Sequence, residues 1–221
     1  MKKTQTLDFL KSQTWGLLLA LLIPSSGWAL EESSLIAFYR GNGSDHHGQK
    51  IEELWAMDDF ETETHHDFIQ WLFPTRYKNR VNPLAPSLQP SDLETFKEDI
   101  GLRERVLHSL DFMLHFYGLK RESHGALVEI HKTAQFDLQA TDWLKRGNHN
   151  YERILRILIS LSTLGLKAEA RALYQVLAEE IYPSHAPQVG SSTLRYWKWA
   201  SEGLLDEKDG TKNRPQFFSQ N

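Results

Sequence analysis

The amino-acid sequence predicts an all-α fold, a single compact multi-helix domain, on three observations. Apolar residues recur at helical spacing from Ser34 onward, helix-breaking residues separate these segments, and no alternating strand pattern stands out. The chain has 221 residues, 40% of them hydrophobic, which suits one domain with short tails. We expect the domain to span residues 34–205, with a leader at 1–29 and a polar, disordered tail at 206–221.

The composition argues against several classes of function. The net charge is -4 and the pI about 6.2, so no long-range attraction draws the whole chain to nucleic acid or to an anionic membrane. The chain has no cysteine, which excludes disulfides, thiolate metal ligands and a cysteine nucleophile. No glycine-rich phosphate loop, nucleophile elbow or paired-carboxylate motif stands out. We therefore expect no cofactor and no nucleic-acid partner, and the sequence does not support an enzyme.

The first residues have the pattern of a secretory signal. Lys2 and Lys3 precede the apolar run Gly16–Ile23, which is followed by Pro24 and by small residues up to Ala29. The run is shorter than the ~20 residues that span a bilayer, and no other stretch is apolar enough to cross one. We expect a periplasmic or secreted protein with a cleaved leader. The alternatives are membrane association through an uncleaved leader, and a cytoplasmic protein whose first residues are a start-site extension or a loosely packed N-terminal helix.

The first half of the domain should begin with a short apolar run, Leu35–Tyr39, and a flexible glycine-rich loop, followed by three helices. Apolar residues and capping signals place these helices at Gln49–Met57, at a segment capped by Asp58 or Asp59 and running to Phe73, and after a Ser91–Glu94 capping box. The helix running to Phe73 should end before Pro74, because a residue before proline is disfavoured in a helix. The stretch from Arg76 to Pro90 holds several prolines and should be a long irregular connection.

The second half should contain longer helices. An apolar stripe from Leu102 to Tyr117 predicts one that Gly118 ends in the left-handed conformation. Lys120–Arg146 is mostly polar, with Phe136 and Trp143 as expected core anchors. Two tightly joined helices should then form an antiparallel hairpin, and a last helix should follow. These three are expected at Tyr151–Leu164, at Lys167–Tyr182 before Pro183, and from a cap at Ser191 or Ser192 to Leu205.

The run His66–Pro74 is the most distinctive motif, because polar residues stand inside an apolar segment. His66 and Gln70 are spaced one helical turn apart beside Trp71, so both are candidates for partly buried polar groups. One interpretation is structural, with both side chains bonded to the backbone of the Arg76–Pro90 connection. The other is that they line a small polar pocket.

The tripeptide Asn148-His149-Asn150 should open the helix Tyr151–Leu164, with one asparagine supplying the cap oxygen. Arg153 and Arg156 place positive charge in its first two turns, where the helix dipole disfavours it by ~0.3–1 kcal/mol each. We expect internal carboxylates to compensate; the alternative is an anionic ligand group, such as a peptide carboxylate, at the helix start. Both arginines should also lie near the Ile69–Phe73 helix.

The chain has ten histidines, so we examined whether they could form a metal site. Glu104, His108, Asp111 and His115 share one helix face, but the same face suits an ordinary solvated helix. His46-His47 and His65-His66-Asp67 add further ligand types. No complete metal motif is present, so we expect no metal and keep the first four residues as weak candidates.

An ordered set of motifs resembles the conserved domain of the opioid growth factor receptor (OGFr) family, in its short, bacterial-type members. The motifs are Phe38-Tyr39, His66–Pro74, Asn82–Pro86, Phe116–Leu119, Asn148–Asn150 with Arg153, Arg156–Leu158 and Leu164–Leu166. The resemblance implies an all-helical domain and the label of a receptor, which in animals refers to binding an enkephalin pentapeptide. The signal-like leader speaks against a nuclear-envelope role here.

The resemblance and the residues together favour a ligand-binding, receptor-like domain whose ligand is a peptide or another small, anionic molecule. The candidate binding residues are His66, Gln70, Trp71, Asn148, His149, Asn150, Arg153 and Arg156. The alternatives are a metal-dependent hydrolase that uses the histidines and carboxylates, and a purely structural interaction module. The sequence does not predict an oligomeric state.

We predict that the leader is removed, because the family resemblance begins only after it and its apolar run has the signal pattern. Mass spectrometry of the protein recovered from its host should find Leu30 at the N-terminus. Recovery of a soluble cytoplasmic form that retains Met1 would contradict export.

Overall fold

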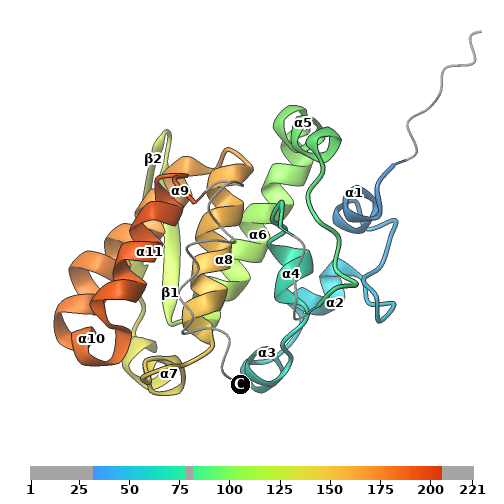
Figure 1. The fold of residues 1–221 in the computed structure, drawn as a ribbon. Coiled ribbons are helices and arrows are strands. Elements are labelled where there is room, and N and C mark those ends of the chain that lie inside the picture. Colours follow the sequence, from blue (N-terminus) through green and yellow to red (C-terminus); the bar gives the residue numbers. More distant parts are fainter. Residues whose placement is uncertain (1–31, 78–81, 206–221) are drawn as a thin grey trace, which may run out of the picture. The chain divides into compact units, whose positions relative to one another are not determined.

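The computed structural model describes residues 32–77 and 82–205 (Figure 1). The predicted leader at 1–29 and tail at 206–221 lie outside the described residues. The described part is mostly helical and holds one two-stranded antiparallel sheet, so the predicted all-α class is right for most of the chain but misses the sheet. In these ranges no helix is long and apolar enough to cross a membrane.

The helices and strands follow one another along the chain without repeats. They are α1 Ser34–Tyr39, α2 Ile51–Trp55, α3 Asp59–Thr64, α4 Ile69–Leu72, α5 Pro90–Glu98, α6 Ile100–Phe116, β1 Leu119–His124, β2 Leu127–Lys132, α7 Phe136–Trp143, α8 Asn150–Thr163, α9 Lys167–Gln175, a π-helical segment Val176–Ile181, α10 Tyr182–Val189 and α11 Ser191–Ser201. Between α4 and α5 the described residues form neither helix nor strand, and residues 78–81 are not described.

The core is built around α8, which packs against α9 and α11 and lies between α11 and α6 in Figure 1. The predicted apolar residues of this helix are buried: Ile154, Leu155, Ile157, Leu158 and Leu161. The predicted stripe of α6 is buried as well, as are the anchors Phe136 and Trp143 of α7. Burial of these apolar faces is the main stabilising contribution, at about 25 cal/mol for each Å² removed from water.

The β1–β2 hairpin corrects the prediction that no strands occur. Its register runs from Leu119 opposite Lys132 to His124 opposite Leu127, and Gly125 in the connecting turn has a φ of 66°. Such positive φ values are typical of two-residue hairpin turns. The strands bury only Leu119 and Ile130, which is why their alternation was too weak to be recognised.

The helix predicted to run from Asp58 to Phe73 is interrupted, which is a second correction. Asp58 does cap α3, accepting a hydrogen bond from the Glu61 amide at 2.8 Å. The helix then ends at Thr64, residues 65–68 are non-helical, and α4 begins at Ile69. The reason is a side chain from α8 that binds the last carbonyl groups of α3.

Several other boundaries differ from the prediction. α5 begins at Pro90, and Asp92 accepts from the Gln89 amide, so the Ser91–Glu94 capping box is wrong. The helical path from Lys167 continues through the π-helical segment into α10, because Pro183 falls in the first turn of α10, where its missing N–H is not needed. Gly190 rather than a serine precedes α11, which ends at Ser201 rather than Leu205, and α2 is shorter than Gln49–Met57.

We predict that Gly118→Ala destabilises the fold more than Gly125→Ala. Both glycines have positive φ, 73° and 66°, so each alanine adds about 1–2 kcal/mol of backbone strain. A Cβ at Gly118 would also lie 2.6 Å from the Phe136 Cα, whereas nothing lies within 4 Å of one at Gly125. Urea unfolding of the two variants measures the difference, and equal losses would contradict a close approach at Gly118.

Candidate functional site

Arg153 of α8 lies at the centre of the candidate site, and its side chain is only 4% exposed. Its Nη1 donates to the Thr62 carbonyl at 2.8 Å, and its Nη2 donates to the Glu63 carbonyl at 3.5 Å and to the His65 carbonyl. The guanidinium also lies 5.3 Å from the centre of the Phe68 ring. These carbonyls belong to the last turn of α3, which otherwise lacks partners, so Arg153 caps that helix from the side.

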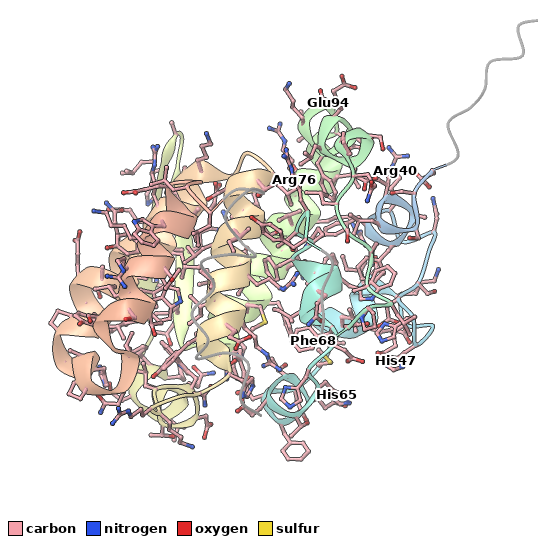
Figure 2. All side chains as sticks on the ribbon, viewed as in Figure 1. Arg40, His47, His65, Phe68, Arg76 and Glu94 are labelled. Carbon is pink, nitrogen blue, oxygen red and sulfur yellow. The ribbon has the colours of Figure 1, made fainter. Side chains whose placement is uncertain are left out.

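Other side chains bind the carbonyl groups that follow. Gln70 Nε2 donates to the His66 carbonyl at 3.3 Å, and Asn82 Nδ2 donates to the Asp67 carbonyl at 3.1 Å. Figure 2 shows His65 and Phe68 at the two ends of this non-helical segment. A backbone that is neither helix nor strand must find hydrogen bonds elsewhere, and here the side chains of Gln70, Asn82 and Arg153 supply them.

His66 and Gln70 therefore differ from their predicted arrangement. His66 precedes α4 and is exposed, whereas Gln70 is buried within α4. Gln70 bonds to the His66 carbonyl and not, as predicted, to the Arg76–Pro90 connection, and its Oε1 has no partner among the described residues. Within the described part of this connection, Asn82 links it to the motif by donating to the Asp67 carbonyl.

The two arginines lie near α4, as predicted, and both donate to backbone carbonyl groups. Arg156 Nη1 donates to the Phe73 carbonyl at 3.1 Å and lies 3.4 Å from Thr75 Oγ1. Burial lowers the pKa of the Arg153 guanidinium below its usual value, although arginine remains charged at any ordinary pH. The arginines thus hold backbone oxygens in place.

The Asn148-His149-Asn150 motif opens α8, as predicted. Asn148 Oδ1 accepts from the Asn150 amide at 2.8 Å, so one asparagine satisfies a donor at the helix start. Asn150 is fully buried; its Nδ2 donates to Glu63 Oε2 at 2.9 Å, and its Oδ1 accepts from Arg153 at 3.2 Å. Asn150 therefore joins α3 to α8.

His66 and His149 are brought together from distant parts of the chain. Their rings meet edge to face, with centroids 4.8 Å apart. His66 Nδ1 lies 3.4 Å from Arg153 Nη2, and His149 Nε2 lies 3.7 Å from Glu63 Oε2 without a hydrogen-bond partner in the described ranges. Partial loss of solvent around the two rings, and then the positive charge of Arg153, hold the pKa of both histidines below the usual range. Both rings are therefore neutral at neutral pH.

The surroundings of this pair form an acidic end, which we define as Asp58, Asp59, Glu61 and Glu63 of α3 with its cap, and Asp137 and Asp142 of α7. Gln139 Nε2 of α7 donates to Asp59 Oδ2 at 3.5 Å, and Asn148 Nδ2 donates to the Asp142 carbonyl at 2.9 Å, so α3, α7 and the start of α8 are neighbours. Figure 1 shows α3 and α7 toward the same end.

The acidic end concentrates the negative charge of the protein. Residues 58–64 and 136–143 carry four and two carboxylates and no lysine or arginine, giving -6, whereas the whole chain carries -4. Within the described part of the chain, none of the six carboxylates has an ion pair with a lysine or arginine. Phe60 and Leu138 of the same two helices are each 74% exposed.

Two of the four weak metal candidates on α6 have other partners. Asp111 forms a two-point ion pair with Arg121 at 2.9 and 2.7 Å, and the His108 ring packs 4.2 Å from the Trp55 ring. In the described ranges, one group of three possible ligands does converge, at His46, His47 and Asp67. The sequence identified these residues as ligand types but not their convergence, because it depends on a loop folding back onto the motif.

Glu63, Tyr39 and Asn82 were not among the candidate site residues. Glu63 binds Asn150, Asn82 binds Asp67, and the Tyr39 hydroxyl donates to the Leu72 carbonyl at 2.5 Å. Tyr39 and Asn82 lie in segments that carried the family resemblance. Nothing in the sequence distinguished Glu63, because it is one of several acidic residues in a polar helix and lies outside the segments that carried the resemblance.

The fold and the site define a class of protein. It is a mostly helical domain in which buried arginine, asparagine and glutamine side chains hold the His66–Pro74 motif in place. The model of the opioid growth factor receptor (OGFr) conserved region matches residues 31–211, and the chain belongs to this family.

Curated relatives agree with the family. The chain is 34% identical over 157 residues to the opioid growth factor receptor of Rattus norvegicus and 36% identical over 154 residues to that of Homo sapiens. These matches cover 69% of this chain, and 27% and 22% of the two relatives. It is also 32% identical over 154 residues to the opioid growth factor receptor-like protein 1 of Xenopus tropicalis, covering 68% of this chain and 29% of that protein. The chain thus spans about a quarter of these relatives. No solved structure matches.

We predict that Arg153→Met lowers the free energy of unfolding by about 3 kcal/mol or more. The change leaves the buried Thr62 carbonyl and the partly buried Glu63 and His65 carbonyls without this donor, at ~1–3 kcal/mol for each buried unsatisfied group. Arg171→Met is the control, because this exposed side chain on α9 should change stability by less than about 0.5 kcal/mol. Urea denaturation at pH 7 measures both, and similar small losses would refute a capping role for Arg153.

We also predict that His149 makes stability depend on pH. Because its folded pKa lies below the unfolded value of about 6.5, its stabilising contribution is full above that value. The contribution is lost as the pH falls through 6.5 toward the lower folded pKa. The difference in unfolding free energy between the wild type and His149→Gln should therefore shrink or reverse from pH 7.5 to pH 5. A constant difference would contradict the lowered pKa.

Proposed function

We propose that this protein is a receptor-like domain that binds a peptide at its acidic end, next to the His66–His149 pair. The family supports a receptor role, since several relatives are named as receptors for the opioid growth factor. The observation that carries the proposal is the group of six carboxylates at one end of the domain, beside two neutral histidines and the exposed side chains of Phe60 and Leu138.

The charge of this surface favours a cationic group on the ligand. Arg153 and Arg156 donate to backbone oxygens, so a ligand carboxylate would have to compete with the carbonyls they already bind. A peptide ammonium can instead approach Glu63, whose Oε2 already accepts from Asn150 and faces His149. Hydrogen bonds to charged groups contribute about 1.5–3 kcal/mol, more than neutral ones. We therefore assign the amino end of the peptide, rather than its carboxylate, to this site.

The exposed rings supply the apolar part of the proposed surface. Phe60 projects from α3, and the edge-to-face pair of His66 and His149 lies beyond the C-terminal end of that helix. Aromatic and cationic groups of a peptide are both attracted to such rings. A short peptide that combines an ammonium group with aromatic side chains fits these features, and the enkephalin pentapeptides belong to this class.

We predict that an enkephalin pentapeptide binds the full chain and that Glu63→Gln weakens binding about tenfold or more. The substitution removes a negative charge while keeping an oxygen that can accept from Asn150. Glu104→Gln is the matched control, because Glu104 is exposed on α6, outside the acidic end. Isothermal titration calorimetry at low and moderate salt measures all three proteins, and rising salt should weaken the wild-type interaction.

An N-acetylated peptide provides the second test, since it lacks the ammonium group. We expect it to bind about tenfold more weakly than the free peptide, equivalent to about 1.4 kcal/mol. Equal binding of both peptides, equal losses in Glu63→Gln and Glu104→Gln, or no binding at all would overturn the proposal.

We further propose that the domain acts outside the cytoplasm. The support is the signal pattern of residues 2–29 in the sequence, and the N-terminal analysis described above tests it.

A further inference from the structure

We propose that His46, His47 and Asp67 form a site for a divalent transition-metal ion of the zinc class. Their ligand atoms all lie within 4.8 Å of one another. Asp67 Oδ2 is 3.1 Å from His46 Nε2 and 2.6 Å from His47 Nε2. This site is separate from the peptide surface proposed above and does not depend on it.

The spacing is close to what a metal ion requires. Zinc bonds to histidine nitrogen and to carboxylate oxygen are about 2.0–2.2 Å long, so ligand atoms around a tetrahedral ion lie roughly 3.3 Å apart. The distances of Asp67 Oδ2 to the two imidazoles, 3.1 and 2.6 Å, would have to widen by about 0.2 and 0.7 Å, and the ligand nitrogens of the two histidines, within 4.8 Å of each other, would have to take up the same spacing. In the metal-free protein the imidazole N–H groups donate to the shared carboxylate oxygen, and the ion would take the place of these bridging protons.

Both parts of the site are held in position. Asp45 is 7% exposed, and its Oδ1 accepts from the amides of His47 at 2.9 Å and Gln49 at 2.8 Å, which fixes the histidine loop. The Asp67 carbonyl accepts from Asn82, which fixes the other side. Little ordering therefore remains to be done on metal binding, which favours affinity.

The ligand types select the class of ion. Two imidazoles and one carboxylate suit zinc and its neighbours in the transition series, whereas magnesium and calcium prefer oxygen ligands alone. Three protein ligands also leave a coordination position for water or another ligand. In the apo protein the side chains of His46, His47 and Asp67 are 13%, 55% and 36% exposed, so an ion can enter from solvent.

Trp71 links the tautomer of His46 to metal binding. Its indole Nε1 donates to His46 Nδ1 at 3.1 Å, with the two ring planes only 4° apart. Indole can only donate, so His46 Nδ1 must be the acceptor and Nε2 must carry the proton. When a metal binds neutral His46 through Nε2, the proton has to move to Nδ1, and the bond from Trp71 is lost. Trp71 therefore weakens metal binding.

The test is calorimetric titration of the full, tag-free chain with Zn²⁺ at pH 7.5. We expect saturable one-to-one binding that each of His46→Gln, His47→Gln and Asp67→Asn weakens at least tenfold. His124→Gln, an exposed histidine on β1, is the matched control and should bind as the wild type does. Trp71→Phe should bind Zn²⁺ about tenfold more tightly, because loss of one hydrogen bond of about 1.4 kcal/mol corresponds to that factor.

Trp71 is buried, so Trp71→Phe is first checked for a native circular dichroism spectrum and a cooperative thermal transition. A second measurement does not depend on this variant. In ¹⁵N-labelled wild type, His46 should have an unprotonated Nδ1 without metal and a protonated Nδ1 once Zn²⁺ is added. Equal Zn²⁺ affinity of the wild type and the three ligand variants, or a His46 tautomer unchanged by Zn²⁺, would overturn the site.

Discussion

The fold of the central motif depends on one interaction, the hydrogen bonds from the buried Arg153 guanidinium to the carbonyl groups at the end of α3. The C-terminal end of a helix carries partial negative charge, so a cation is favourable there even without a carboxylate partner. The planar guanidinium can bind several carbonyls at once, which an ammonium group cannot do as well. This allows α3 to stop after six residues and the chain to turn into α4.

The need to satisfy these backbone carbonyl groups also explains the role of the polar residues in and around the motif. Arg153, Arg156, Gln70 and Asn82 each bind a backbone carbonyl, and Asn150 connects Arg153 to Glu63. Polar residues in an apolar segment, which at first look like a binding site, here replace the hydrogen bonds that a continuous helix would have made. The groups that a ligand could contact lie next to these residues. They are the carboxylates of α3 and α7 and the rings of His66 and His149.

The sequence predicted elements whose signals are local. The apolar face of α8, the stripe of α6 and the left-handed Gly118 follow from spacing and from glycine stereochemistry, and the structure agrees. The break after Thr64 could not be predicted locally, because Arg153 lies 88 residues from His65. The convergence of His46 and His47 on Asp67 likewise depends on a loop folding back. The shallow β1–β2 hairpin was missed because it buries few side chains.

The β1–β2 hairpin also has a consequence for solubility. In the described part of the chain it forms a sheet of two strands, and each strand of such a sheet has an outer edge that a strand of another molecule could join. The side chains of Lys120, Arg121, Glu122, Glu129 and Lys132 place charges of both signs along the two strands. A second molecule aligning its own strand there would have to remove these groups from water. The polar character that concealed the hairpin in the sequence therefore also protects it from edge-to-edge aggregation.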